Sequence, residues 1–244
     1  NNDHQSRPRS SSAMSDTFHI TDGPSFVNGE LVNADALQSA WLKEIEAIIS
    51  ASPDSPKHLA FVIAGLRVAA KVKSLDKISI TALAKISGYS RATFFRDYGK
   101  FHEFAIKSYQ QTCYASALVY EKRLAEHDLS RTQFVELSGA ILYGANVCIP
   151  NEVVARLWQS KDWAHLDFHP HLPQVAAVMT RYLRDNAETA SLRFSDQEML
   201  DAVCSLDRDI LMSRLEKHSE FPSERQYKRL KAFLHGFILL HEEQ

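Results

Sequence analysis

The chain has 244 residues, a formal net charge of −2 and 45% hydrophobic residues. This composition excludes a disordered or fibrous chain and allows one sizeable core or two modest ones. No uninterrupted apolar run reaches the roughly 18 to 20 residues that span a bilayer, and the start lacks the layout of a secretory signal. We therefore expect a soluble, cytoplasmic protein of one or two globular domains.

Charge is distributed unevenly along the chain. Residues 57–107 hold ten Lys or Arg and three acidic residues, a formal charge of +7, so the remaining residues carry −9. A compact basic segment joined to an acidic body is typical of a head that binds a polyanion such as nucleic acid. A solvated basic surface without a partner would have the same composition, so this alternative stays open on charge alone.

The first 56 residues divide into a leader, a helix and a break. Residues 1–33 are rich in Ser, Asn, Asp and Gly without hydrophobic periodicity, which predicts a disordered or artificially added leader, with Met14 as a candidate native start. Apolar residues at helical spacing predict an extra amphipathic helix over 34–51. Pro53 and Pro56 end this pattern, because a proline disfavours helix in the residue before it. A new unit therefore begins near Pro56.

The rest of the chain shows helical periodicity and no convincing strand alternation. The sequence therefore predicts an all-α protein, divided into a head over 57–107 and a body over 108–244. The expected helices cover residues 57–73, 80–87, 91–96, 102–126, 131–148, 151–160, 174–188, 195–218 and 223–241.

The segment from Ser79 to Tyr98 predicts a helix-turn-helix. Ser79 can cap a first short helix, Gly88 allows the tight turn at its end, and Ser90 can cap a second helix. In such a motif the first residues of the second helix enter the major groove of DNA. An arginine there can donate two hydrogen bonds to guanine, which makes Arg91 the best candidate for base reading and Arg96 the next.

Hydroxyls and backbone N–H groups at the two helix starts are suited to phosphate contacts, which set the register of binding rather than its sequence preference. Each serine could equally be an ordinary cap, and Arg91 a solvent-facing charge. The residues expected to contact DNA are Ser79, Thr81, Ser90, Arg91, Ala92, Thr93, Phe95, Arg96 and Lys100.

Residues 57–107 resemble the amino-terminal head of the tetracycline-repressor (TetR) family of bacterial transcription regulators. The resemblance lies in Ser79, Leu83-Ala84, Gly88-Tyr89-Ser90, Thr93-Phe94-Phe95 and Tyr98, with Phe61, Ala64, Val68 and Ala69 in the preceding helix. Two positions depart from the family pattern. Phe95 stands where the family usually has Tyr, and Phe101 where it has Lys, both common phosphate contacts; Lys100 is displaced by one residue.

The resemblance implies a carboxy-terminal domain that binds a small effector and forms a homodimer through two helices of each subunit. Segments 195–218 and 223–241 provide a suitable amphipathic pair, although periodicity does not separate a subunit interface from a monomer core. The residues expected at the interface are Val203, Leu206, Ile210, Leu230, Phe233 and Phe237.

Aromatic residues in the middle of the body are candidates for an effector pocket, because their rings are apolar and several carry a polar tip. Plain core packing explains them equally well. The residues are Phe134, Tyr143, Trp158, Trp163 and Phe168.

His165, His169 and His171 form an HxxxHxH cluster that could bind a transition metal. Only Asp162 and Asp167 lie nearby as carboxylates, and the flanking prolines favour a solvated polar loop, so we expect no metal and no cofactor. Cys113, Cys148 and Cys204 lie far apart, without CxxC spacing, and we expect reduced core residues.

The motifs of common enzyme classes, including GxSxG, GxxxxGK[ST], GxGxxG and HExxH, are not found, so we expect no enzyme activity. The sequence predicts a homodimeric DNA-binding transcription regulator, a repressor released from a palindromic operator by a small-molecule effector. The alternative is a helical small-molecule- or metal-binding protein with a degenerate DNA-binding head.

Overall fold

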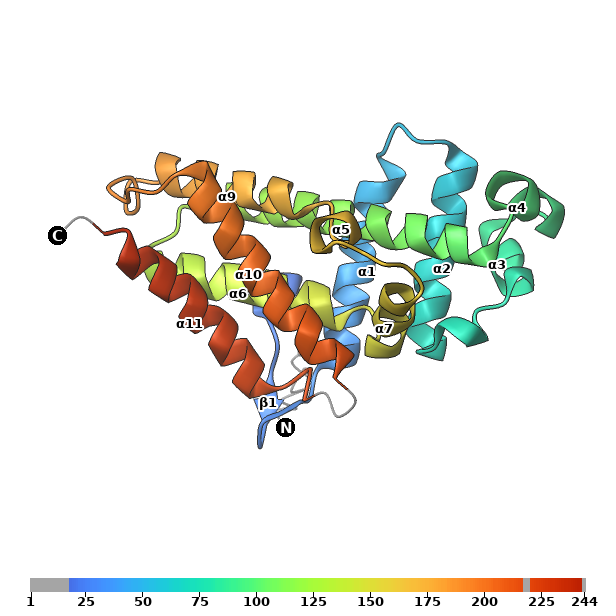
Figure 1. Ribbon diagram of the computed structural model, residues 1–244, viewed down its shortest axis with the longest axis horizontal. Helices are drawn as coiled ribbons and strands as arrows, with labels where there is room; N and C mark the ends of the chain where they lie inside the picture. Colours follow the sequence, from blue (N-terminus) through green and yellow to red (C-terminus); the bar gives the residue numbers. More distant parts are fainter. Residues whose placement is uncertain (1–17, 217–219, 243–244) are drawn as a thin grey trace, which may run out of the picture.

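The computed structural model describes residues 18–216 and 220–242, and within them the chain is almost entirely helical (Figure 1). The expected all-α class is confirmed. The helices are α1 (Ala34–Ser50), α2 (Pro56–Val72), α3 (Ile80–Ser87), α4 (Arg91–Tyr98), α5 (Phe101–Ala125), α6 (Arg131–Val147), α7 (Asn151–Gln159), α8 (His165–Phe168), α9 (Leu172–Asp185), α10 (Asp196–Leu215) and α11 (Glu224–Leu240).

The predicted helices agree with these bounds to within a few residues, and the prediction missed the short α8. Serine caps explain why several helices begin where they do. Ser130 and Ser195 each accept a hydrogen bond from the third residue of their helix, whose side chain in turn accepts one from the serine N–H. Cap chemistry and hydrophobic period therefore indicate the same boundaries.

The segment before α1 differs from the prediction. A 3-10 turn η1 (Ile20–Asp22) and a hairpin of β1 (Phe26–Val27) and β2 (Glu30–Leu31) precede the helix, and Ile20 is 1% exposed. The expectation of an unstructured leader is wrong from Phe18 onward, because η1 packs on α6 and the ring of Phe26 stacks on Tyr227. Met14 and the expected leader over 1–13 lie outside the described residues.

Helix α1 is a central element of the fold. It packs against α2, α5 and α6, and buries Leu37, Trp41, Ile45 and Ile49. Burying side chains of this size from water contributes roughly 1.5–3 kcal/mol each. The helix predicted as an extra element thus joins the head to the body.

The apolar core has three parts. The largest fills the body between α1, α5, α6, α9, α10 and α11, a second lies around α7 and α8, and a third belongs to the head. Helix α2 contributes to two of them, since Phe61 faces the head core while Val62 faces the body core. Helix α5 runs from the head into the body, beside α9 (Figure 1).

The three cysteines are free, with Cys113 buried and the other two half-buried, as expected. Burial raises the pKa of the Cys113 thiol well above its usual value, which keeps it protonated. No helix in the described ranges is both long and apolar enough to cross a membrane.

Candidate DNA-binding surface and ligand cavity

The helix-turn-helix forms through the local interactions that its sequence predicts. Ser79 Oγ accepts a hydrogen bond from the Ala82 N–H at 3.1 Å, and Ser90 Oγ accepts one from the Thr93 N–H at 3.1 Å. Gly88 ends α3 with φ at +77°, a left-handed conformation that favours glycine, and its N–H donates to the Ala84 carbonyl. These contacts fix the turn between α3 and α4.

An aromatic cluster holds α4 against the rest of the head. Phe94 is fully buried, and its ring meets those of Phe61 and Phe104 at centroid distances of 5.4 and 5.1 Å. Tyr98 lies 4.9 Å from Phe104 in an edge-on arrangement. Such pairs contribute roughly 0.5–1.5 kcal/mol each beyond burial. The opposite face of α4 is left to solvent.

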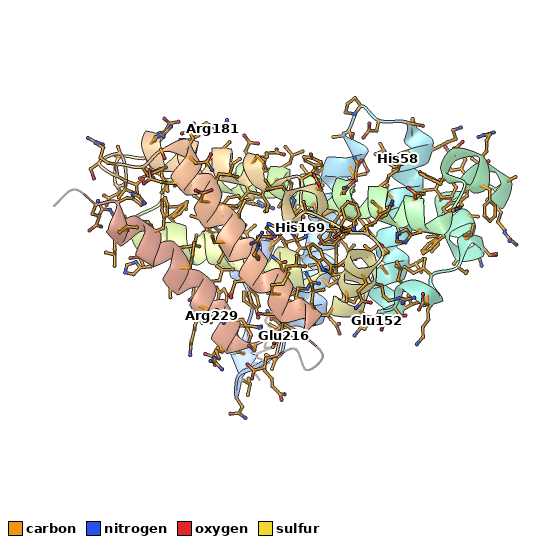
Figure 2. The ribbon with its side chains drawn as sticks, in the orientation of Figure 1. His58, Glu152, His169, Arg181, Glu216 and Arg229 are labelled. Atoms are coloured by element: carbon orange, nitrogen blue, oxygen red, sulfur yellow. The ribbon has the colours of Figure 1, made fainter. Side chains whose placement is uncertain are left out.

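The last turn of α4 is also tied to the start of α2. Tyr98 Oη lies 2.7 Å from His58 Nδ1, and His58 lies near the beginning of α2 (Figure 2). Burial raises the pKa of Tyr98 to about 12, so its hydroxyl keeps its proton and can donate to the imidazole. Lys57 and Asp97 add an ion pair at 3.8 Å. These two contacts therefore fix the end of α4 to the start of α2.

The residues expected to contact DNA lie together on the outer surface of the head. Thr93 is half-buried, and the other eight, from Ser79 to Lys100, are exposed. Phe95 packs edge-on against the ring of Phe94 at 5.8 Å, yet 43% of its surface is exposed, which is unusual for a phenylalanine. Arg96 pairs with Asp97 at 3.0 Å, an interaction that the sequence analysis missed, whereas Arg91 has no ion pair within the described part of the chain.

Phe101, the second departure from the family pattern, is the first residue of α5. Phe101 packs at the edge of both the head core and the α7 core, with its ring 6.2 Å from Phe104. It therefore presents no charge at the surface where the family has Lys. Lys100 is the residue before α5 and is exposed, so its flexible ammonium group is the nearest cation to that position.

The aromatic residues expected around an effector do not surround one cavity. Phe134 and Tyr143 belong to the body core, where Tyr143 Oη donates to the Ser223 carbonyl at 2.8 Å. The remaining three pack on one another beside α7, since the Phe168 ring lies 5.0 Å from Trp158 and 5.5 Å from Trp163. Their aromatic character is used for packing.

An enclosed apolar cavity of about 70 Å³ lies instead between α1, α2, α5, α6 and α7. That volume is space for several water molecules or a small organic molecule. Its wall combines head and body residues: Trp41, Gly65, Leu66, Ala69, Ala105, Ser108, Tyr109 and Val153, among others. Trp41 Nε1 and Ser108 Oγ are both buried and have no hydrogen-bond partner among the described residues.

Four of the six residues expected at a dimer interface are buried within the protomer. Val203, Leu206, Ile210 and Leu230 are at most 7% exposed and belong to the body core. Their assignment to an interface is wrong, because they lie on the inner sides of α10 and α11. Phe233 is 39% exposed, and the half-buried Phe237 packs against Phe194 at 5.4 Å.

The outer side of α11 is apolar for three turns. Ala232, Phe233 and Gly236 are exposed there, and Leu240 follows with 76% of its surface exposed. A methyl group at Gly236 would meet no atom within 4 Å, so the surface is open at that point. Charged residues border it, including Arg229, which pairs with Asp209 on α10 at 2.7 Å (Figure 2).

The histidine cluster is not the solvated loop that we expected. His165 and His169 are buried, and both ring systems face the carboxylate of Asp207 on α10, more than 35 residues away in sequence. Asp162 and Asp167 are exposed. Spacing along the chain did not reveal Asp207 because the partner is brought in by tertiary packing.

Comparison with known proteins gives a structural likeness only. No family model and no curated protein matches the sequence. The structure is similar to that of the TetR family repressor AlkX from Dietzia sp. strain DQ12-45-1b, with 12% identity, a TM-score of 0.53, and coverage of 77% of this chain and 98% of the other. The TetR family regulator PfmR from Thermus thermophilus aligns with 14% identity and a TM-score of 0.42, over 75% of this chain and 99% of its own. Together with the helix-turn-helix described above, the likeness to AlkX shows that this chain has the all-α fold of a TetR family repressor.

Proposed function

We propose that this protein is a homodimeric, DNA-binding transcription regulator of the TetR type. The observation that carries the proposal is the exposed face of α4, where Ser90, Arg91 and Arg96 surround Phe95 on a helix whose other face is buried. A rigid helix with a basic outer face fits the major groove of DNA. The formal charge of +7 on residues 57–107 supplies the attraction to phosphate.

The residues on this face have distinct roles. Arg91, at the first position of α4 and without a competing ion pair in the described structure, reads base edges. The hydroxyl of Ser79 accepts a backbone N–H as a cap and keeps its own proton for donation to phosphate. Ser90 Oγ also accepts a backbone N–H and shares a hydrogen bond with Thr93 Oγ1, so one hydroxyl proton of this pair remains for phosphate. Arg96 donates to Asp97 through Nε, which neutralises part of its charge, so we expect it to contribute less to affinity than Arg91 does.

The outer side of α11 forms the subunit interface. An exposed apolar face built from Phe233, Gly236 and Leu240 favours burial against a second copy, and small residues allow two helices to approach closely. Two heads then contact two half-sites, as a palindromic operator requires. This assignment replaces the four inner-facing residues of α10 and α11 with the outer side of α11, and it keeps Phe233.

The enclosed cavity is the effector site. Its walls are apolar, and the unpaired hydroxyl of Ser108 fits a small, largely apolar molecule that carries a hydrogen-bond acceptor. The five aromatic residues that the sequence analysis assigned to an effector pocket do not line this cavity, because they pack in the apolar cores.

The position of the cavity supports coupling to DNA binding. Its α7 wall is bonded to the segment just before α3, through Ser74 Oγ to Glu152 at 2.6 Å and Arg156 to Asp76 at 3.2 Å. Its α2 wall is linked to α4 by the hydrogen bond between His58 and Tyr98. An effector that binds one arrangement of these helices better than the other shifts the population of DNA-competent heads and so releases a repressor.

A second candidate is a helical small-molecule-binding protein whose head no longer recognises DNA. The absence of the hydroxyl at Phe95 and of the charge at Phe101 favours it. The two candidates differ in the salt dependence of DNA binding. A regulator that contacts several phosphates loses affinity steeply between about 50 and 200 mM salt.

The test is a fluorescence anisotropy titration of a mixed-sequence duplex at those two salt concentrations. Lys100→Ala is expected to weaken binding and reduce the salt slope by about one phosphate contact. Lys122→Ala, an exposed lysine at the far end of α5, serves as the matched control and should leave both unchanged. If the wild type does not bind the duplex, or if Lys100→Ala and Lys122→Ala bind it equally well, the result supports the second candidate.

A further inference from the structure

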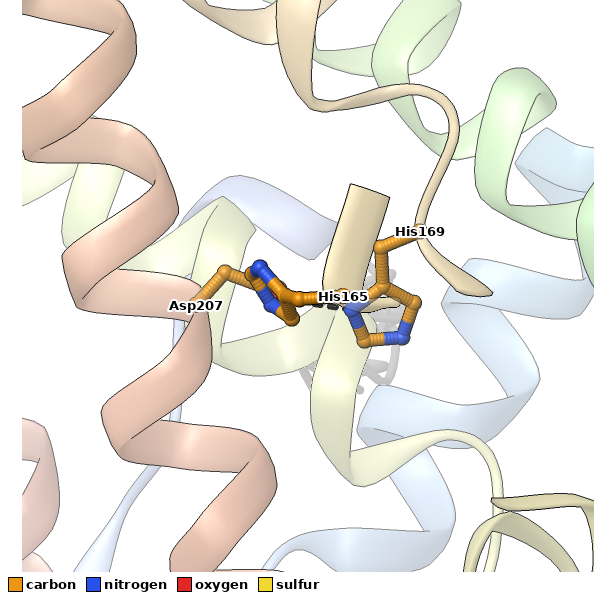
Figure 3. Close-up of side chains that lie close together, drawn as sticks. All are labelled: His165, His169 and Asp207. Atoms are coloured by element: carbon orange, nitrogen blue, oxygen red, sulfur yellow. Dashed lines mark hydrogen bonds and ion pairs between the residues drawn. The ribbon is translucent and has the colours of Figure 1, made fainter. Parts of the chain in front are cut away.

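Three potential metal ligands converge in the body, between the α8 segment and α10. His165 Nε2 lies 2.8 Å from Asp207 Oδ2, and His169 Nδ1 is hydrogen-bonded to the same oxygen (Figure 3). The three ligand atoms lie within 4.8 Å of one another. Two imidazole nitrogens thus lie beside one carboxylate oxygen. Imidazole and carboxylate groups are both ligands that transition metals bind.

The cluster is shielded from solvent. The side chains of His165, His169 and Asp207 are 6%, 5% and 13% exposed. The Asp207 carboxylate, which both imidazoles contact inside the protein, supplies the cluster with an oxygen ligand.

A neighbouring side chain orients one of the imidazoles. Tyr109 Oη on α5 lies 2.6 Å from His169 Nε2, the nitrogen that points away from Asp207. Metal-binding histidines generally have such a partner on the second ring nitrogen, which fixes the tautomer and the ring orientation.

A third histidine supplies an independent observation. His171 Nδ1 is buried without a hydrogen-bond partner among the described residues, and its ring centroid lies 5.5 Å from that of His169. An imidazole nitrogen without a partner can offer its lone pair to a metal ion. His171 and Asp207 also line one cavity of about 60 Å³. A buried nitrogen without a partner destabilises the fold, and a ligand would offset that cost.

We propose that His165, His169 and Asp207 bind a divalent transition-metal ion of the zinc class, with His171 or a water molecule as the fourth ligand. Zn–N and Zn–O distances of about 2.0–2.1 Å in tetrahedral geometry separate ligand atoms by about 3.3 Å. The imidazoles therefore need to retreat from Asp207 by less than about 1 Å, and their two nitrogens, up to 4.8 Å apart, need to approach each other by at most about 1.5 Å. Mg²⁺ and Ca²⁺ prefer sets of oxygen ligands and do not fit two imidazoles.

The site would join three parts of the body. His165 is the first residue of α8 and His169 follows its end, Asp207 belongs to α10, and Tyr109 lies on α5, the helix that begins in the head. An effect of the metal on DNA affinity would rest on the function proposed above. Metal binding itself does not, and its test contains no DNA.

The experiment titrates the chelator-treated, full-length protein with Zn²⁺ against a chromophoric competitor, and with Co²⁺ to record the visible bands of a tetrahedral site. The wild type should bind one equivalent per chain. His165→Gln and Asp207→Asn should each lower the affinity by on the order of 100-fold or more, since changing even an outer partner of a ligand costs 10–100-fold. Tyr109→Phe removes such an outer partner of His169, so it should lower the metal affinity by only about 10–100-fold.

The matched control is His127→Gln, which removes an exposed histidine and should bind as the wild type does. Thermal melts with and without Zn²⁺ separate misfolding from loss of the site, because only proteins with an intact site should melt higher when the metal is present. Wild-type affinity no tighter than that of His165→Gln or Asp207→Asn, or an equal loss in His127→Gln, would overturn the proposal.

Discussion

Gly144 on α6 lies directly against the indole of Trp41 on α1, and a methyl group at Gly144 would stand 2.7 Å from Trp41 Nε1. The close approach lets α1 pack into the centre of the protein, where Trp41 is 1% exposed. Because Trp41 also lines the enclosed cavity, the same contact positions a wall of the proposed effector site.

Gly144→Ala is expected to destabilise the fold by roughly 1–3 kcal/mol, since the indole is buried and has little room to move. Gly139→Ala on the same helix is the matched control. Its methyl group would lie 2.8 Å from Lys231 Cγ, in a side chain that reaches the surface and can shift further than a buried indole, so its loss of stability should be smaller than that of Gly144→Ala. Urea denaturation measures both free energies of unfolding, and equal values would show that α1 is not held by this contact.

Filling the enclosed cavity should stabilise the ligand-free protein. Ala105 lines it, and Ala105→Leu is expected to raise the free energy of unfolding by about 0.5–2 kcal/mol. The comparison is Ala64→Leu in the head core, where Ala64 is fully buried and lines no described cavity. Overpacking there should cost roughly 1–3 kcal/mol. If both variants lose stability alike in calorimetry, the cavity is not open to a ligand.

Phe95→Tyr should tighten DNA binding. The ring is already exposed on α4, and an added hydroxyl can donate to phosphate as the family's tyrosine does. A gain of about 0.5–1.5 kcal/mol corresponds to roughly two- to tenfold in affinity on every duplex sequence. Phe95→Leu, which keeps an apolar side chain without a hydroxyl, should not give this gain. Anisotropy titrations on two unrelated duplexes compare the three proteins, and a sequence-dependent effect would argue against a phosphate contact.

Phe233→Asp should convert a dimer into a monomer, because it places a charge in the centre of the proposed α11 interface. Val27→Asp on the hairpin is the control, since Val27 is also an exposed apolar residue, at 57%. Light scattering after size-exclusion chromatography gives the mass of each. A Phe233→Asp dimer, or a Val27→Asp monomer, would place the interface elsewhere.

The helices and the head were predictable because their signals are local. Ser79, Gly88 and Ser90 act within four residues of their own positions, and hydrophobic periodicity follows the helix surface directly. The hairpin before α1 escaped prediction, since its strands of two residues each are too short to show an alternating pattern and are held by contacts with α11.

The ligand cavity and the histidine cluster depend on tertiary packing. Asp207 reaches His165 from α10, and the cavity is closed by α1, whose residues show only an ordinary amphipathic stripe. Periodicity also marked both Leu230 and Phe233 as apolar without showing that one faces the core and the other solvent. Which apolar side of a helix is buried becomes evident only once its neighbours are placed.

The central claim, that α3 and α4 read DNA, is tested most directly by selecting bound sequences from a pool of random duplexes at two salt concentrations, for the wild type and for Arg91→Ala. We predict that the wild type enriches a palindromic site with half-sites about one helical turn, or a multiple of it, apart, and that higher salt weakens its binding. Arg91→Ala should relax the preference at one base pair of each half-site, by about 1–3 kcal/mol. A wild type that enriches no sequence, or an Arg91→Ala variant with an unchanged site, would contradict the account.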